Sequence, residues 1–121
     1  VYEKNADQQM EQKMEYCYHY DEQGRLSDKE MLSWDETKKS WTKSSRFTYK
    51  YYKNGYNVEV SRWNKEKQAY DLPSEVTLYR SQAPNLTIVK TYKMNKQQDN
   101  MYLSSSMVVM EPIENSLLAI R

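Results

Sequence analysis

Large apolar side chains alternate with polar ones along most of this chain of 121 residues. In the segment KMEYCYHY, one set of alternate residues is Met14, Tyr16, Tyr18 and Tyr20, and the other is Glu15, Cys17 and His19. A period of two residues is typical of β-strands with one apolar and one polar face. The pattern predicts eight strands, over residues 12–20, 25–34, 41–52, 56–63, 70–80, 86–94, 101–110 and 116–121.

The alternation also assigns side chains to faces of these strands. In the third segment one face is expected to carry Trp41, Phe47, Tyr49 and Tyr51. In the fifth it is expected to carry Tyr70, Leu72, Val76 and Leu78. The segment MYLSSSMVVM differs, because both of its faces are apolar at its end. We therefore expect that something covers that end.

Three segments repeat one pattern without gaps: WDETKKSW (34–41), WNKEKQAY (63–70) and MNKQQDNM (94–101). In each, a large apolar residue precedes Asp or Asn, and a second large residue closes the segment. Asp and Asn side chains accept hydrogen bonds from backbone two residues further on, so they begin turns. The bulky end residues should then meet across hairpins as the pairs Trp34–Trp41 and Trp63–Tyr70, with loops of the six intervening residues.

Turns of a second kind lie between these segments. The two glycines occur in DEQG (21–24) and KNG (53–55), whereas SQAPN (81–85) and EPIENS (111–116) carry Pro instead. The dipeptide Asn54-Gly55 predicts a hairpin turn of the primed type, with positive φ at both residues. Since the two kinds of turn alternate about every 30 residues, we expect one domain of four repeat units, at about 1–31, 32–61, 62–92 and 93–121.

The N-terminal segment NADQQMEQKMEY, residues 5–16, admits two interpretations. Met10 and Met14 are four residues apart and Asp7 would lie in the first turn, which is consistent with a short helix. Met10 also stands where Trp41, Tyr70 and Met101 stand in the later repeats, and this similarity favours a strand.

Short connections make neighbours in sequence neighbours in space, so the strands predict an all-β antiparallel meander. Eight strands at about 4.8 Å spacing would make a sheet about 38 Å wide, where twist begins to force curling. Only 19 of 121 residues are Leu, Ile, Val or Phe, too few to fill a closed barrel. We therefore expect an open, twisted sheet, with a sandwich or barrel-like closure as the alternative.

The remaining composition indicates a folded chain with a thin core. Twelve Tyr, three Trp and seven Met supply apolar area that aliphatic residues do not. Tyr and Trp bury a ring while the polar tip stays in water, which suits half-exposed faces. The net charge of +1 and the interspersed signs disfavour nucleic acid as a partner. No run of apolar residues has the length of a transmembrane helix.

Candidate chemistry is sparse. One Cys and one His make a metal site improbable, and two glycines cannot form a phosphate-binding loop. Cys17 and His19 share a strand face, but catalytic pairs usually join distant segments. The adjacent carboxylates, Asp21 with Glu22, Asp28 with Glu30 and Asp35 with Glu36, fall in turns or on charged faces. These features predict no enzyme activity, no catalytic residue and no cofactor.

The motif YHYDEQGRL resembles the tyrosine-aspartate repeat of Rhs-type proteins, through Tyr18, Tyr20, Asp21, Gly24, Arg25 and Leu26. Over residues 14–103, the same motif followed by repeated W-[DN]-x5-[WY] hairpins resembles an exported Bacteroides family, domain of unknown function 3836. The resemblance implies export, to the periplasm, the outer-membrane surface or the extracellular space, and brings no activity with it. The absence of Met before Val1 agrees with removal of a leader.

Two functions fit this pattern. The first is an exported, non-enzymatic binding protein, with a glycan or another envelope protein as partner and Trp34, Trp41, Trp63 and Tyr70 as the binding surface. Rings held on short strands lose little entropy on binding and offer a large contact area. The second is an architectural module of a larger envelope assembly, whose edge strands pair with another chain.

Overall fold

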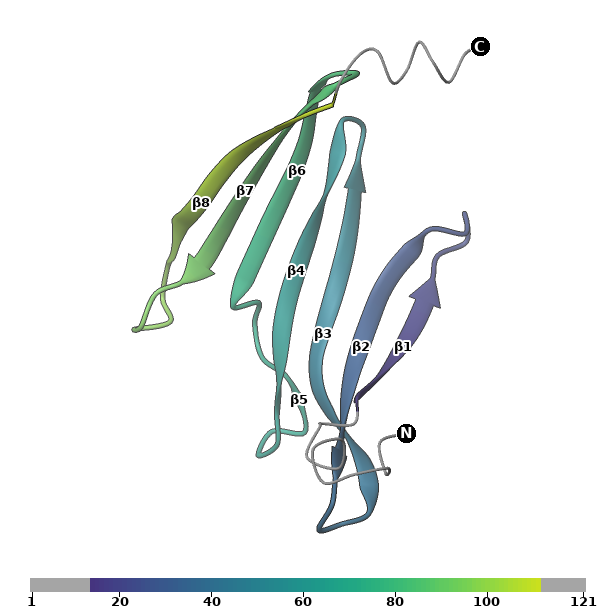
Figure 1. Ribbon diagram of the computed structural model, residues 1–121. Coiled ribbons are helices and arrows are strands. Elements are labelled where there is room, and N and C mark those ends of the chain that lie inside the picture. Colours follow the sequence, from purple (N-terminus) through teal and green to yellow (C-terminus); the bar gives the residue numbers. More distant parts are fainter. Residues whose placement is uncertain (1–13, 112–121) are drawn as a thin grey trace, which may run out of the picture.

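The computed structural model describes residues 14–111, which form one antiparallel sheet (Figure 1). Its strands are β1 (Met14–Tyr20), β2 (Leu26–Asp35), β3 (Ser40–Tyr52), β4 (Gly55–Asn64), β5 (Ala69–Tyr70), β6 (Glu75–Ala83), β7 (Leu86–Met94) and β8 (Met101–Met110). The order across the sheet is β1-β2-β3-β4-β6-β7-β8, and β5 pairs with β4 off this path. This is the open meander that the sequence predicts, and it is not closed into a barrel.

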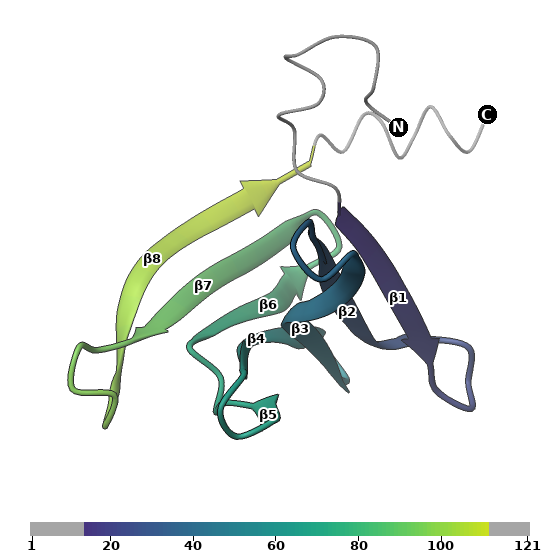
Figure 2. The same ribbon diagram turned by 90° about the horizontal axis from the view of Figure 1, so that it is seen from below.

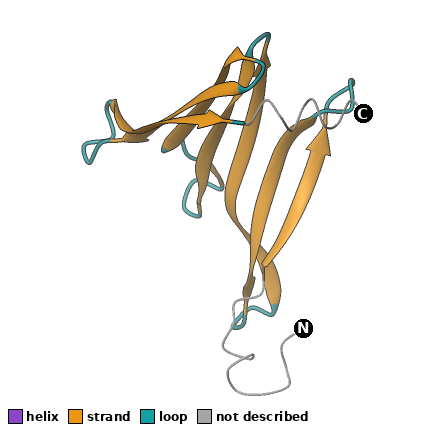
Figure 3. Cartoon of the chain, turned by 45° about the horizontal axis from the view of Figure 1, so that its top comes forward, coloured by secondary structure: helices purple, strands orange, loops and turns teal. Residues whose placement is uncertain are grey.

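The sheet is strongly twisted, as antiparallel sheets of many strands are. Seen from below, β1 and β8 diverge on opposite sides of the molecule, and β5 stands off from the main sheet (Figure 2). Strands and loops make up the described residues (Figure 3). Within this part of the chain, no helix has the length and apolarity needed to cross a membrane. The expected strand over 116–121, and most of the segment with two interpretations, lie outside the described residues.

The segment expected as one strand over 70–80 is in fact two strands. β4 pairs first with β5, through Trp63 and Tyr70, and then with β6 from Val60 onward. The chain loops out in between. On either side of this loop, the backbone N–H of Asp71 donates to the carbonyl of Arg62, and that of Ser74 donates to the carbonyl of Val60. Pro73 lies in this loop because it has no N–H to give to a strand ladder. Leu72 is consequently 80% exposed, so its expected place beside Tyr70 is wrong.

A β-bulge in β3 changes which residues share a face. Met31 pairs with Ser45, but the next residue of β2 pairs with Lys43, so Ser44 has no opposite residue. A bulge of this kind resets the alternation of side chains. Trp41 pairs with Trp34 and Phe47 pairs with Lys29, and those partners are an odd number of residues apart on β2. Trp41 and Phe47 therefore lie on opposite faces, not on the same one as expected.

The register defines two chemically different faces. On one, which we call the clasp face, lie both expected ring pairs, Trp34–Trp41 and Trp63–Tyr70, together with charged residues of the central strands. The other, the tyrosine face, carries Tyr16, Tyr18, Phe47, Tyr49, Tyr51, Tyr56 and Tyr79. Each strand thus contributes to both faces, as the period of two requires.

Burial is shallow on both faces. Among residues 14–111, Val89 at 8% exposure is the one buried apolar side chain, and Ser45 and Ser61 are buried beneath longer neighbours. The most extensive packing between elements is between strands that are hydrogen-bonded neighbours. The thin core expected from the composition is confirmed: rings and aliphatic stems cover one another within each face.

Gly55 is required for a reason that differs from the expected one. Tyr52 pairs with Gly55, so the turn consists of Lys53 and Asn54, and Asn54 does not have a positive φ. The prediction of a primed turn centred on Asn54 and Gly55 is therefore wrong. Gly55 has φ +155° and lies so close to β6 that a Cβ atom would overlap the backbone carbonyl of Tyr79. Only glycine lets the two backbones approach this closely.

Replacing Gly55 with Ala should lower the free energy of unfolding by about 2–3 kcal/mol, because β4 and β6 must separate to admit the methyl group. Gly24→Ala is the matched control. Gly24 has φ +81° but open space around its Cα, so only backbone strain of about 1 kcal/mol is expected there. Chemical denaturation of both variants measures the difference, and equal losses would contradict this account of Gly55.

Candidate functional site

Both expected ring pairs meet on the clasp face. The rings of Trp34 and Trp41 are 5.3 Å apart with planes at 73°, and those of Trp63 and Tyr70 are 5.0 Å apart at 76°. These edge-to-face arrangements are the favourable geometry for aromatic pairs. The third pair is also opposed across its hairpin, with Met94 opposite Met101. The repeat therefore predicted three cross-strand pairs correctly.

The turn that closes each hairpin uses the predicted Asp or Asn. The Oδ1 atom of Asp35 accepts from the backbone N–H of Thr37, at 2.9 Å, and Oδ1 of Asn64 accepts from that of Glu66, at 3.0 Å. Lys39 and Gln68, the equivalent positions near the end of each turn, both have positive φ. The paired strands continue one residue beyond the rings, so each loop has four residues and not six.

The third turn has a different hydrogen-bond pattern. Asn95 Oδ1 accepts from the backbone N–H of Asp99, and its Nδ2 donates to the carboxylate of the same residue. The residue with positive φ is Gln98, one place earlier than in the other two loops. The Met–Met hairpin thus keeps the position of the clasp but not the geometry of its turn.

Tyr70 links β5 to two strands beyond its own partner. Its Oη donates to Glu30 Oε2 of β2 at 2.6 Å, and the guanidinium of Arg46 from β3 lies 4.5 Å from its ring. Within residues 14–111, the buried Nε of Arg46 has no hydrogen-bond partner, so ring stacking is the contact that holds this side chain. These contacts fold the β5 hairpin onto the clasp face.

Lys43 lies between the two ring pairs. Its ammonium group is 5.0 Å from the ring of Trp63 and 3.5 Å from Glu30 Oε2, and it follows Trp41 by two residues on the same face. By the register, Trp34, Trp41, Lys43, Trp63 and Tyr70 lie on one face of neighbouring strands, and we call this strip the clasp surface. Its rings are half-buried, and Trp41 is the most open of the three Trp residues, at 37% exposure.

The electrostatics of this strip follow from the Tyr70–Glu30 hydrogen bond. That bond, with the nearby Lys43 charge, lowers the pKa of Glu30 below its ordinary value of 4.5. Burial, and the same hydrogen bond, raise the pKa of Tyr70. Glu30 is therefore a carboxylate and Tyr70 a neutral donor at neutral pH, which is the pairing that a charge-assisted hydrogen bond needs.

The tyrosine face is an aromatic surface that the residue-by-residue search for sites missed. Tyr56 stacks on Tyr79 with ring centres 4.6 Å apart, and Tyr49 and Tyr51 lie 6.5 and 6.0 Å from Tyr56. Burial raises the pKa of both Tyr49 and Tyr56. The alternation of Tyr with polar residues predicts an aromatic face on each strand. Only the register between the strands shows that these tyrosines share one face of the sheet.

The structure shows where three of the side chains considered for catalysis, Cys17, His19 and Asp21, lie. His19 Nδ1 is 2.7 Å from Asp28 Oδ1 and Cys17 is exposed. Asp21 caps its own turn, accepting from the backbone N–H of Gln23 and of Arg25, and those bonds lower its pKa. Within the described part of the chain, no group of three His, Cys, Asp or Glu side chains could hold a metal ion.

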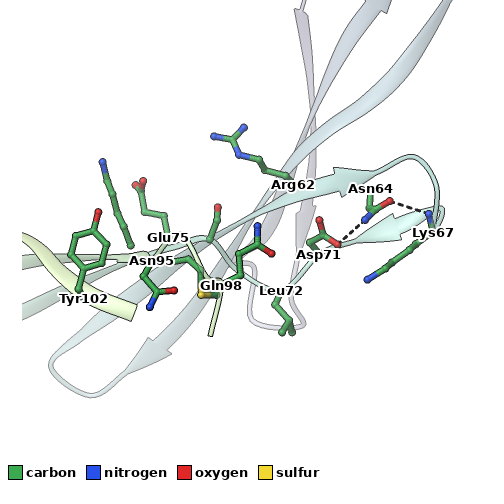
Figure 4. Close-up of a pocket in the computed structure, with 12 residues that line it drawn as sticks. Arg62, Asn64, Lys67, Asp71, Leu72, Glu75, Asn95, Gln98 and Tyr102 are labelled. Carbon is green, nitrogen blue, oxygen red and sulfur yellow. Dashed lines mark hydrogen bonds between the residues drawn. The ribbon is translucent and has the colours of Figure 1, made fainter. Parts of the chain in front are cut away.

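A polar hollow of about 610 Å³ lies beside the β4–β5 hairpin, near the turn between β7 and β8 (Figure 4). Its lining consists of Arg62, Asn64, Lys67, Asp71, Leu72, Ser74, Glu75, Lys93, Met94, Asn95, Gln98 and Tyr102. Asn64 Nδ2 donates to Asp71 Oδ1 at 3.1 Å and so fixes one wall. Arg62 alternates with Trp63 along β4, so it projects from the side opposite the clasp surface. The hollow offers both donors and acceptors, which suits a polar ligand.

Comparison with known proteins assigns the family. The model of a family of unknown function (DUF3836) matches residues 1–81. The chain belongs to this family. DUF3836 proteins of known structure share the fold: one from Parabacteroides distasonis ATCC 8503 is 15% identical, with a TM-score of 0.66 over 88% of this chain and 98% of that one. No curated protein matches the chain.

Two further structures show the same likeness. The DUF3836 protein from Bacteroides vulgatus ATCC 8482 is 16% identical, with a TM-score of 0.63 over 79% of this chain and 97% of that one. A protein with unknown function from Bacteroides fragilis NCTC 9343 is 21% identical, with a TM-score of 0.58 over 84% and 94%. At these identities the likeness shows a shared fold and carries no residue roles.

Replacing Tyr70 with Phe should lower the free energy of unfolding by about 1–2 kcal/mol, because the carboxylate of Glu30 loses a donor. Tyr92→Phe is the control, since Tyr92 is another half-buried tyrosine for which no hydroxyl hydrogen bond is found among residues 14–111. It should change stability little. Denaturant unfolding of both variants at pH 7 measures the effect. An unchanged free energy of unfolding for Tyr70→Phe would show that this hydrogen bond makes no net contribution to stability.

The same bond should make stability depend on pH. The pKa of Glu30 is lowered in the folded state, so its stabilisation is present above pH 4.5 and disappears as the pH falls through the folded-state value. Unfolding measured from pH 7 down to strongly acidic pH should show a smaller acid-induced loss for Tyr70→Phe than for wild type. Identical pH profiles would contradict the link between Tyr70 and Glu30.

Proposed function

We propose that this protein is an exported, non-catalytic binding protein whose clasp surface holds an extended glycan. The observation that carries the proposal is the strip of two edge-to-face ring pairs with Lys43 between them, on one face of neighbouring hairpins. Export is supported by the resemblance to an exported Bacteroides family, and solved relatives come from Bacteroides and Parabacteroides.

The ring pairs suit a ligand with flat apolar faces. Sugar rings have such faces, and an indole or phenol ring offers the area to pack against them. Because Trp34 holds Trp41, and Tyr70 holds Trp63, the rings are already ordered before a ligand arrives. Less side-chain entropy is then lost on binding, which increases the affinity for a given contact area.

Polar groups beside the rings supply the second requirement of sugar binding. Lys43 has 48% of its side chain exposed and can donate to hydroxyl or carboxylate oxygens, while Glu30 is largely covered by its neighbours. A row of rings with a cation at its centre favours a polymer laid across β2, β3 and β5 over a small molecule in a closed pocket. An anionic polysaccharide would gain most from Lys43.

The architectural alternative is favoured by a different observation. Among residues 14–111, β1 and β8 each have a hydrogen-bonded partner strand on one side only. Open edges of this kind can pair with strands of another chain. In that case the clasp surface would serve only to hold the hairpins together.

Trp41→Ala should weaken glycan binding at least about fivefold, the loss of roughly 1 kcal/mol expected for one aromatic contact. Trp63→Ala should weaken it by as much or more, since Tyr70 and Lys43 lose their neighbour as well. A glycan array identifies a bound polysaccharide, and isothermal titration with that polysaccharide measures the variants. Circular dichroism and melting curves establish that each variant remains folded.

Tyr102→Ala is the matched control, because Tyr102 is an exposed ring that lines the polar hollow and not the clasp surface. It should bind like wild type. Loss of binding in Tyr102→Ala with full binding in Trp41→Ala would place the ligand in the hollow and contradict the proposal. If parallel arrays detect binding to proteins and to no glycan, that result would favour the architectural alternative.

A further inference from the structure

The last described strand has an unusual composition for the edge of a sheet. β8, MYLSSSMVVM, contains no charged residue, no Pro and no Gly. Each of the other strands of more than two residues in the described part carries at least one charge. Edge strands are normally protected against pairing by charges, Pro or covering segments, and β8 has neither of the first two.

The end of β8 is also exposed and apolar on both faces. Met107 and Val109 project from the tyrosine face opposite Val89 and Thr87, and Val108 and Met110 project from the clasp face opposite Ile88 and Leu86. Their exposed fractions are 54% for Met107, 59% for Val108, 42% for Val109 and 67% for Met110. The sequence led us to expect cover over this end, and none of the residues 14–111 provides it.

The opposite edge of the sheet is different. β1 is apolar on one face only, and its other face carries Glu15, Cys17 and His19. If β1 of another molecule lay against β8, Glu15 and His19 would be brought beside an uncharged strand. Among the described strands of more than two residues, β8 alone brings no charge to the contact.

We propose that β8 is a self-association edge, which pairs antiparallel with β8 of a second copy of this chain. The pairing would join two sheets into one through a two-fold axis perpendicular to the sheet, a closed arrangement that leaves no further β8 edge free. In antiparallel pairs, opposite residues share a face, so both apolar sides of β8 gain a partner at once.

The position of the axis follows from the apolar residues. An axis at Val108 sets Val108 against its own copy and Met107 against Val109, and it places Glu111 opposite Ser105. An axis at Val109 would instead set Glu111 against Met107. Since a carboxylate opposite a methionine is unfavourable, the structure assigns the axis to Val108. This assignment is independent of the proposed glycan binding.

Analytical ultracentrifugation of the full chain tests the association. Wild type should sediment at about twice the chain mass of 14.6 kDa over a concentration series. Val108→Lys and Val108→Glu should each sediment as monomers, because like charges would face each other across the axis. Mixing the two variants should restore the dimer. The exposed Leu72 lines the polar hollow with Tyr102, at the other end of β8 from Val108, and Leu72→Lys should remain dimeric.

Cross-linking tests the register. In a Cys17→Ser background, Val108→Cys should form an intermolecular disulfide on mild oxidation, since directly opposed residues have the separation that a disulfide needs. Leu72→Cys in the same background should not. A wild-type monomer at every concentration would overturn the proposal and indicate that another part of the chain covers β8. A dimer that survives Val108→Lys would place the association on another surface.

Discussion

Side chains of this sheet can bury apolar area only against neighbours on the same face, because the described strands form one layer. That constraint determines which residue types can stabilise the sheet. An aliphatic side chain on a single-layer sheet would remain half in water, whereas a Tyr or Trp covers its neighbours with a ring and leaves a polar atom outside. Pairs such as Tyr56 with Tyr79 and Trp34 with Trp41 therefore bury apolar area that a second layer would cover in a β-sandwich. The abundance of Tyr and the scarcity of Leu and Ile in this chain follow from the single-layer arrangement of the strands.

The β5 hairpin is the closest approach to a second layer. Pro73 breaks the strand, the chain loops out, and the short β5 carries Tyr70 over β3 to Glu30 on β2. The same contact brings Trp63, Lys43 and Arg46 together. A feature that looks like an interruption of the repeat thus assembles the most chemically varied part of the surface. It also explains why Glu30, a carboxylate on a strand face, has a lowered pKa.

The parts of this structure that sequence could predict are those determined over short distances. Asp35 and Asn64 cap turns through atoms two residues away, so the ring pairs beside them were predictable from spacing. The bulge at Ser44 was not, because either of two adjacent serines fits a strand and only the partner strand decides which is left unpaired. The role of Gly55 depends on Tyr79 of another strand, and the contact of Tyr70 with Glu30 spans forty residues. Such contacts leave no local signature, and the tyrosine face likewise needed the register of several strands.

The meander topology has a consequence for how the fold is lost. Each strand is held by its immediate neighbours, so the molecule resembles a one-dimensional array in which detachment of one element leaves the others nearly intact. Within the described part of the chain, β1 and β8 have one neighbouring strand each, while β3 and β4 have partners on both sides and the contacts of Tyr70 nearby. In a single chain, opening should therefore begin at the rims and move inward, and backbone amides should exchange with solvent fastest in β1 and β8 and slowest in β3 and β4. Pairing of β8 with a second copy would leave β1 as the fastest-exchanging rim. In such a molecule the stability of a binding surface depends on how far it lies from the rim, and Trp41, Lys43 and Trp63 of the clasp surface lie on the slowest-opening strands.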